Sequence, residues 1–176
     1  MTAALHSLPH RSPSKGREQD AWGVLGTVLD PEVPALSVVD LGIVREVTDA
    51  HDGHLDIVLT PTYSGCPATE AIESDIRAAI ESAGLGPARI TYRLAPAWTT
   101  DWISAEGSRK LAAYGIAPPG CRAADTAVVR VLARNVPCPR CKSAHTERLS
   151  AFGSTACKAT YRCLDCREPF EYFKPI

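Results

Sequence analysis

The first apolar pattern in the chain has helical spacing and begins near Glu18. Apolar residues recur every three or four positions as far as Leu29. The run ends before Pro31, because a residue that precedes proline disfavours helical backbone. The pattern predicts an amphipathic helix, followed by a stiff, turn-rich link over residues 30–34.

The spacing then changes to one that is typical of strands. Residues 38–47 are rich in β-branched side chains and predict an extended segment. Apolar residues at alternate positions over 55–59 predict a second strand. Asp52 and Gly53 lie between the two segments and favour a tight turn, so the two strands are expected to form a hairpin.

A second helix is expected after the loop that ends in Gly-Cys-Pro at residues 65–67. Proline suits the first position of a helix, and an isoleucine stripe runs from Ile72 to Ile80 before Gly84 ends the pattern. Residues 90–94 alternate as a third strand, joined to the second by a right-handed crossover. The sequence therefore predicts a small α+β domain in the order α-β-β-α-β, with a further helix over 104–114.

Composition marks the ends of this domain. Residues 1–17 are rich in Ser, Pro, Gly and basic residues without periodicity, which predicts a disordered tail. Two prolines and a glycine at 118–120 mark a linker. We therefore expect an α+β domain over residues 18–118, a linker over 119–134 and a small β-ribbon over 135–176.

Two C-x-x-C knuckles, Cys138 with Cys141 and Cys163 with Cys166, lie in the C-terminal part. Paired knuckles let four thiolates converge tetrahedrally on one soft divalent ion, so they predict a structural Zn²⁺ site. The 21 residues between the knuckles slightly exceed the usual spacing, which a longer hairpin accommodates. In so small a ribbon the metal replaces most of the missing core.

Two disulfides are the alternative for these four cysteines, and they require an exported protein. The stretch from Met1 to Pro13 is polar and shows no secretory signal, and no run approaches the apolar length that spans a bilayer. We therefore expect a cytoplasmic protein, with no membrane partner, whose reduced thiols are free to bind metal.

The net charge of -1 conceals a division along the chain. Residues 18–118 carry six basic and fifteen acidic side chains, whereas residues 119–176 carry ten basic and five acidic ones. This asymmetry either steers a charged partner or simply keeps each surface soluble.

Cys66 is the candidate for chemistry outside the knuckles. A thiol at a helix N-terminus faces unpaired backbone N–H groups, which favour its thiolate and make it reactive or metal-ligating. Thr60, Thr62 and Ser64 offer hydroxyls to a thiolate or to a bound cluster. The alternative is that Cys66 is a small buried apolar residue with no chemistry.

Other polar residues are weaker candidates. Cys157 lies between the knuckles and is expected to be a non-ligand, although it offers a replacement thiolate or part of a second metal site. Cys121 is interpreted as an incidental thiol, and His145 as a competing metal ligand. Asp40 and Glu46 are expected to be surface acids rather than an acid–base pair.

Residues 30–44 and 59–67 resemble the signature segments of a known family of small α+β domains. Eukaryotic cytosolic iron–sulfur targeting proteins and bacterial iron–sulfur assembly factors share this domain. The functional cysteine of that family lies in the Gly-Cys-Pro segment and matches Cys66. The resemblance implies that Cys66 is a ligand for iron or an iron–sulfur cluster in transit.

Residues 96–102, 115–119 and 152–158 look like segments of the PaaD family, accessory subunits of bacterial phenylacetyl-CoA epoxidase systems, and the likeness covers about residues 18–174. It implies an accessory protein of phenylacetate catabolism that assembles or delivers an iron or iron–sulfur cofactor. The implied partners are the ring-epoxidising oxygenase and its iron–sulfur flavin reductase.

The chain has neither a Glu-x-x-His pair nor a G-x-G-x-x-G fingerprint, so we expect no di-iron centre and no direct electron uptake from a pyridine nucleotide. We therefore do not expect it to be an enzyme.

Two other classes of function stay open. Basic zinc ribbons track phosphate backbones, so a nucleic-acid-binding protein is one alternative, although the acidic domain argues against a nucleic-acid partner. Iron in the four-thiolate site would instead make a rubredoxin-like electron carrier, because tetrahedral sulfur ligands suit both metals.

Overall fold

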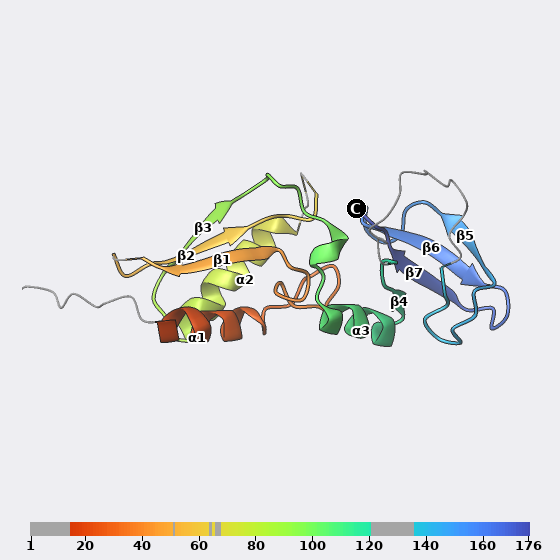
Figure 1. Cartoon of the computed structure of the whole chain (residues 1–176), viewed down its shortest axis with the longest axis horizontal. Coiled ribbons are helices and arrows are strands. Elements are labelled where there is room, and N and C mark those ends of the chain that lie inside the picture. The colour runs from red at the N-terminus through yellow and green to blue at the C-terminus, as the bar shows by residue number, and fades with distance from the viewer. Residues whose placement is uncertain (1–14, 51, 64, 66–67, 121–135) are drawn as a thin grey trace, which may run out of the picture.

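The computed structural model describes residues 15–50, 52–63, 65, 68–120 and 136–176. Most of the predicted tail and linker lie outside these ranges, so both stay predictions. The described elements form two groups that lie side by side along the long axis of the molecule (Figure 1).

The first group follows the predicted α-β-β-α-β order. Its elements are α1 (Lys15–Leu25), β1 (Val44–Asp49), β2 (Leu55–Leu59), α2 (Thr69–Ser82) and β3 (Ala88–Tyr92). The strands form one sheet in the order β1-β2-β3, in which β1 is antiparallel and β3 parallel to β2. The predicted hairpin and the crossover between the second and third strands are confirmed.

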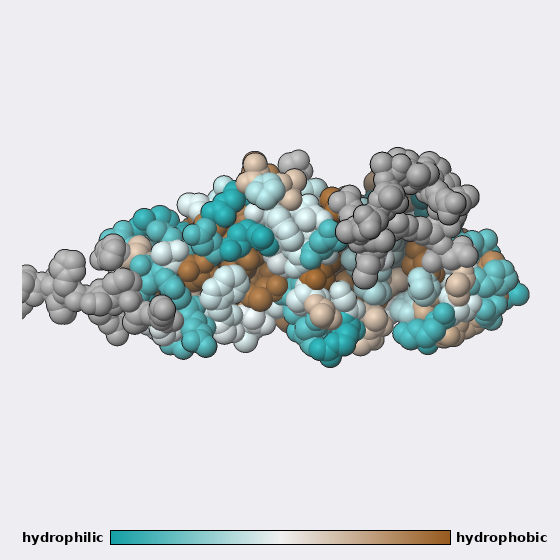
Figure 2. Space-filling model, in the orientation of Figure 1, coloured by the Kyte–Doolittle hydropathy of each residue, from teal (hydrophilic) through white to brown (hydrophobic). Residues whose placement is uncertain are grey.

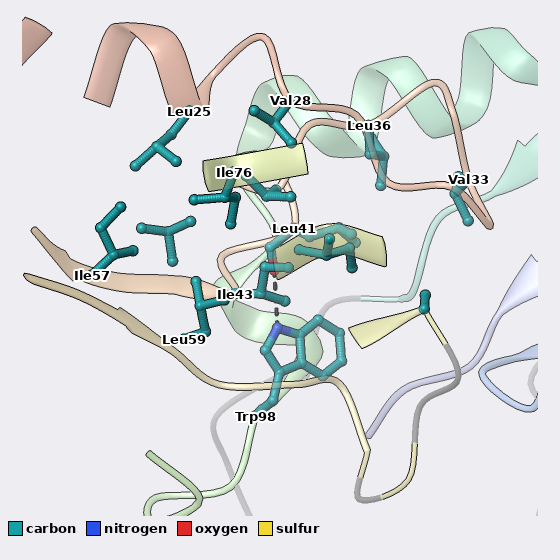
Figure 3. Close-up of a cluster of buried hydrophobic side chains, with 14 of the residues drawn as sticks. Leu25, Val28, Val33, Leu36, Leu41, Ile43, Ile57, Leu59, Ile76 and Trp98 are labelled. Carbon is teal, nitrogen blue, oxygen red and sulfur yellow. Dashed lines mark hydrogen bonds between the residues drawn. The ribbon is translucent and has the colours of Figure 1, made fainter. Parts of the chain in front are cut away.

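One hydrophobic core holds these helices on the sheet. The predicted isoleucine stripe of α2 is buried at Ile72, Ile76 and Ile80. Leu25 of α1 and Ile57 of β2 lie in the same cluster (Figure 3). Burial of each such aliphatic side chain contributes on the order of 2 kcal/mol, so packing rather than helical propensity fixes α1 and α2.

Helix α1 begins before the predicted Glu18 because Arg17 is anchored to the far end of the sheet. The Arg17 guanidinium donates to the carbonyl oxygens of Leu85 and Gly53, at 3.0 and 2.7 Å, and forms an ion pair with Asp49. The predicted tail therefore ends at least three residues earlier than expected.

The extended segment predicted over residues 38–47 is wrong in its first half, since β1 begins only at Val44. The preceding residues form a loop held by Asp40, whose carboxylate accepts from the backbone N–H and the hydroxyl of Ser37 at 3.1 and 2.9 Å. Val38, Leu41 and Ile43 of this loop are buried because it crosses the core, and that burial produced the strand-like pattern.

The predicted helix over 104–114 is confirmed as α3 (Ala105–Tyr114), which follows the short 3₁₀ helix η1 (Thr100–Trp102). The Ser104 hydroxyl caps α3 by accepting from the Gly107 backbone N–H at 2.8 Å. Gly115, with φ of 92°, ends the helix in left-handed backbone that glycine adopts at little cost.

The second group is a four-stranded sheet in the order β4-β7-β6-β5. Its strands are β4 (Ile116–Ala117), β5 (Thr146–Ser150), β6 (Lys158–Cys163) and β7 (Pro169–Phe173). Strands β6 and β7 carry the aromatic residues Tyr161, Phe170, Tyr172 and Phe173. Strand β4 pairs in parallel with β7, so a segment expected in the α+β domain belongs to the ribbon sheet. The α+β fold class with a C-terminal ribbon is confirmed.

The ribbon and the α+β domain share part of one core. Phe173 of β7 is 1% exposed and belongs to the same buried cluster as Leu25 and Ile76. Its ring lies 6.2 Å from that of Trp98, whose indole N–H donates to the Leu41 carbonyl oxygen at 3.0 Å (Figure 3). The last strand of the ribbon therefore completes the core of the domain beside it.

The face shown in Figure 2 is mostly hydrophilic at its periphery, with hydrophobic residues visible in the middle. Among the described residues, no helix combines the length and the apolar character needed to cross a bilayer.

Candidate metal centre and adjoining cavity

The structure brings the four predicted zinc ligands together. The sulfur atoms of Cys138, Cys141, Cys163 and Cys166 all lie within 4.8 Å of one another. The Cys138–Cys166 and Cys141–Cys163 sulfur distances are 3.7 and 3.5 Å. A tetrahedral zinc ion with Zn–S bonds of about 2.3 Å requires sulfur separations of about 3.8 Å. The four-cysteine cluster therefore fits Zn²⁺.

The two knuckles have matching backbone geometry. The residue after each knuckle, Lys142 or Arg167, has a positive φ, of 63° and 66° respectively. Such a turn aims backbone N–H groups at the sulfur atoms, and the Cys166 N–H lies 3.5 Å from the Cys163 sulfur. This hydrogen bond, together with those from the Asp165 backbone and from the Cys141 and Cys166 side chains, lowers the pKa of Cys163 to about 7, which favours the thiolate that a metal needs.

His145 does not join this cluster among the described residues. Its Nδ1 lies 3.0 Å from a carboxylate oxygen of Asp165, and the Ser143 hydroxyl donates to the other oxygen. The imidazole is therefore engaged at the surface of the ribbon and is not a fifth donor to the metal centre.

A cavity of about 30 Å³ lies where the α+β domain meets the ribbon. Its wall combines residues of the loop before β1, of strand β2 and the loop after it, of helix α2 and of the ribbon. The polar side chains of the wall belong to Asp30, Glu32, Thr60, Thr62, Thr69, Tyr92 and Cys157, and Phe173 contributes an apolar surface.

Cys66 and its neighbours Ser64 and Pro67 lie outside the described residues. Thr62 and Thr69, which lie four residues before and three residues after Cys66 in the sequence, both line the cavity. The Thr60 hydroxyl, expected to serve a thiolate, instead donates to the Arg93 carbonyl oxygen at 2.8 Å.

Asp30 and Glu32 are cavity residues that sequence reasoning missed, because it treated residues 30–34 only as a turn. Asp30 is 8% exposed, and one carboxylate oxygen accepts from the backbone N–H groups of Glu32 and Val33 at 2.9 and 2.7 Å. Burial nevertheless raises the pKa of Asp30, and burial together with Asp30 raises the pKa of Glu32. The sequence did offer one signal for Asp30 and Glu32, because the segment that resembles the iron–sulfur assembly family begins at Asp30.

The remaining candidates have structural partners. Asp40 is buried and accepts from Lys110 at 2.6 Å, and the exposed carboxylate of Glu46 pairs with Arg93 at 2.7 Å. Cys157 is buried, lines the cavity and lies outside the four-cysteine cluster. Cys121 lies outside the described residues.

Comparison with known proteins divides the chain in the same way as the structure. Residues 18–91 match the family model of an iron–sulfur cluster assembly protein, and residues 122–174 match that of the PaaD zinc beta ribbon domain. A crystal structure of a domain of unknown function, DUF59, from Bacillus anthracis has a TM-score of 0.52 and 25% identity, and covers 55% of this chain and 92% of that one.

Two relatives extend the comparison. A protein of Escherichia coli (strain K12), named as a putative subunit of 1,2-phenylacetyl-CoA epoxidase, is 48% identical over 89% of this chain and 92% of its own length. An "Fe-S protein maturation auxiliary factor" of Porphyromonas gingivalis (strain ATCC BAA-308 / W83) is 36% identical over 53% of this chain and 90% of its own length.

Proposed function

The chain belongs to the PaaD family of 1,2-phenylacetyl-CoA epoxidase subunits, and from this premise we propose that it matures the metal cofactor of that oxygenase system. In this proposal it is an accessory protein of phenylacetate catabolism rather than a catalyst. It assembles or delivers iron or an iron–sulfur cluster, here called the cargo, to the oxygenase or to its iron–sulfur flavin reductase.

The observation that carries the proposal is the cavity that Thr62 and Thr69 line, because Cys66 lies between these two residues in the sequence. The α+β domain is similar to assembly and maturation factors, and a cysteine in this part of the chain is therefore a candidate ligand for their cargo. In the proposal the Cys66 thiolate ligates the cargo transiently, because a soft thiolate binds iron and iron–sulfur clusters well and exchanges by ligand substitution.

The ribbon has a different role. We propose that Cys138, Cys141, Cys163 and Cys166 hold one structural zinc ion, which leaves no open coordination position for chemistry. The ribbon then stabilises the cavity wall and offers a surface to the partner proteins. We expect these partners to be cytoplasmic and expect no nucleic acid among them.

The test is the Cys66→Ser substitution, examined in cells that also produce the oxygenase and the reductase. The variant is expected to keep its fold and its zinc while one client loses iron or cluster and ring epoxidation fails. Ser74→Ala, on an exposed position of α2, is the control and should mature both clients. Normal iron content of both clients with Cys66→Ser would remove the proposed role of this thiol.

A further inference from the structure

Two acidic side chains in the cavity wall lack a cationic partner. Asp30 is 8% exposed, Glu32 is half-buried, and both line the cavity. Within the described part of the chain, neither carboxylate takes part in an ion pair, and no lysine or arginine lines the cavity. Buried carboxylates are normally paired, because taking a charge out of water is costly. The wall therefore favours a cation that another molecule supplies.

Lys158 is the basic residue whose charge acts on both carboxylates, but its ammonium group is engaged elsewhere. It lies 3.0 Å from a carboxylate oxygen of Glu171, and it approaches the backbone carbonyl oxygen of Glu32, at 3.5 Å, rather than the carboxylate. The two backbone hydrogen bonds that Asp30 accepts both fall on its Oδ1 atom, so Oδ2 takes part in neither. Neither Lys158 nor the turn held by Asp30 supplies the missing cation.

The rest of the cavity wall is mainly aliphatic and aromatic. Leu41, Ile43 and Leu59, which Figure 3 labels, contribute to it together with Phe173. A lysine side chain matches both parts of the wall, because its four-carbon stem packs on apolar surface while its ammonium group pairs with carboxylates. Building on the proposed function, we propose that this cavity binds a lysine side chain of the client protein.

The dimensions of the cavity suit this residue. A cavity of about 30 Å³ has room for about two water-sized groups and so admits the end of one slender side chain. The planar guanidinium group of arginine is broader than the compact ammonium group of lysine. Tyr92 of the wall is 42% exposed, so the wall reaches the surface from which a client approaches. The proposed function holds the cargo at the same cavity, and a client docked there is within reach of it.

The test measures the affinity of the full-length, zinc-loaded protein for the purified oxygenase and, separately, for the purified reductase. The wild type is expected to bind at least one of them. The double substitution Asp30→Asn with Glu32→Gln should weaken that binding by at least about tenfold, because loss of one partner of a buried charge pair speeds dissociation. Asp75→Asn with Glu81→Gln removes the same two charges from exposed positions of α2 and is the matched control, with an expected change below about twofold.

A carbodiimide crosslinker identifies the partner residue, because it couples a carboxylate directly to an amine in contact with it. In the wild-type complex, mass spectrometry is expected to find Asp30 or Glu32 coupled to one lysine of the client. Replacing that client lysine with methionine, which keeps an apolar stem, should weaken binding as the double substitution does. Should the double variant not fold, the coupling and the client substitution decide the matter.

Three results overturn the inference: neither protein binds the wild type, the double variant binds as its control does, or no client lysine is coupled to Asp30 or Glu32. If Cys66→Ser leaves a client without iron while the double variant binds and matures both clients normally, the proposed function stands and this inference fails. If Cys66→Ser matures both clients normally while the double variant loses binding, the lysine site stands and the proposed role of Cys66 fails.

Discussion

At the scale of single residues, Asp40 connects two segments that are distant in the sequence. Its carboxylate accepts from Ser37 in its own loop, from the Ser104 hydroxyl at 3.2 Å and from the Lys110 ammonium at 2.6 Å. Burial alone would raise the pKa of Asp40, but the hydrogen bonds from Lys110 and Ser37 hold it below the ordinary value of 3.8. From the sequence, Asp40 was expected to be a surface acid. In the structure it is buried and joins the loop before β1 to α3.

We predict that Asp40→Asn lowers the free energy of unfolding by about 1 to 3 kcal/mol at pH 7, because charged hydrogen bonds are lost. The folded-state pKa lies below the unfolded-state one, so this stabilisation is full above about pH 4 and disappears as pH falls through the folded-state value. Urea unfolding of variant and wild type at several pH values measures the difference. Asp75→Asn, on the exposed side of α2, should change little at any pH.

Phe173 lies near the end of the chain, yet its replacement is expected to have a large effect on stability. Replacing a buried phenylalanine with alanine costs about 3 to 5 kcal/mol, so Phe173→Ala should destabilise the protein by this amount. It should also change the fluorescence of Trp98, whose ring faces Phe173. Phe152 is 66% exposed, so Phe152→Ala is the control, with an expected change within about 0.5 kcal/mol. Equal effects of the two substitutions would contradict a shared core.

At the scale of elements, β7 links the metal centre to the α+β domain. Its neighbour β6 carries Cys163 at one end and follows Cys157 at the other. After β7 the chain continues along the domain, where the Thr100 backbone N–H donates to the Ile176 carbonyl oxygen at 3.3 Å. We therefore expect the loss of zinc at one end of the ribbon sheet to disturb the cavity at the other end.

We predict that chelation of zinc raises hydrogen exchange in β5, β6 and β7, and also around Trp98 and Thr100. The reason is that Phe173 would lose its ring contact with Trp98, and Ile176 its hydrogen bond with Thr100. Strand β2 and helix α2, which pair and pack within the domain, should stay protected. Exchange followed by mass spectrometry locates the change, and protein purified without chelator should contain one zinc ion per chain. Protection at Trp98 that survives complete zinc removal would refute this coupling.

The elements with regular periodicity were predictable from sequence, and the others were not. The isoleucine stripe of α2 and the alternation in β2 express burial on one face, which the pattern records directly. The loop over residues 38–43 has the same apolar content without the strand, because core loops bury side chains too. Strand β4 has two residues and exists only because β7 lies beside it, so no local signal predicts it.

At the scale of the whole molecule, three of the seven basic residues that the structure describes in the ribbon form ion pairs within it. Arg140 lies 3.2 Å from Glu168, Lys158 pairs with Glu171, and Arg162 pairs with Glu147. The ribbon thus presents less free positive charge than its composition indicates, and it adjoins an acidic domain. Both facts weaken the nucleic-acid-binding alternative.

We therefore predict only weak binding to double-stranded or single-stranded nucleic acid at physiological salt, with a dissociation constant no tighter than about 10⁻⁵ M. Fluorescence anisotropy of labelled oligonucleotides measures it. Because phosphate contacts release counterions, a true binder would lose affinity steeply as salt increases. Tight binding with such a slope would restore the nucleic-acid alternative.

The two candidate sites differ in how far sequence could predict them. The zinc centre was predictable because each C-x-x-C pair is local and the spacing itself implies tetrahedral thiolates. The cavity was not, because its wall joins Asp30, Thr60 and Cys157, which no spacing rule connects. Only the packing of the ribbon against the domain brings these residues together.

The contact between the Lys158 ammonium and the Glu32 carbonyl oxygen, at 3.5 Å, joins positions 126 residues apart. On the ribosome, the N-terminal part of a chain emerges and folds first, at synthesis rates of about 5–20 residues per second. Glu32 and its loop are thus outside the ribosome well before β6 and β7 have been made. Until the ribbon has been made, the wall that Cys157 and Phe173 contribute to the cavity is absent, so cargo that binds there, as the proposed function requires, is expected to load only after translation.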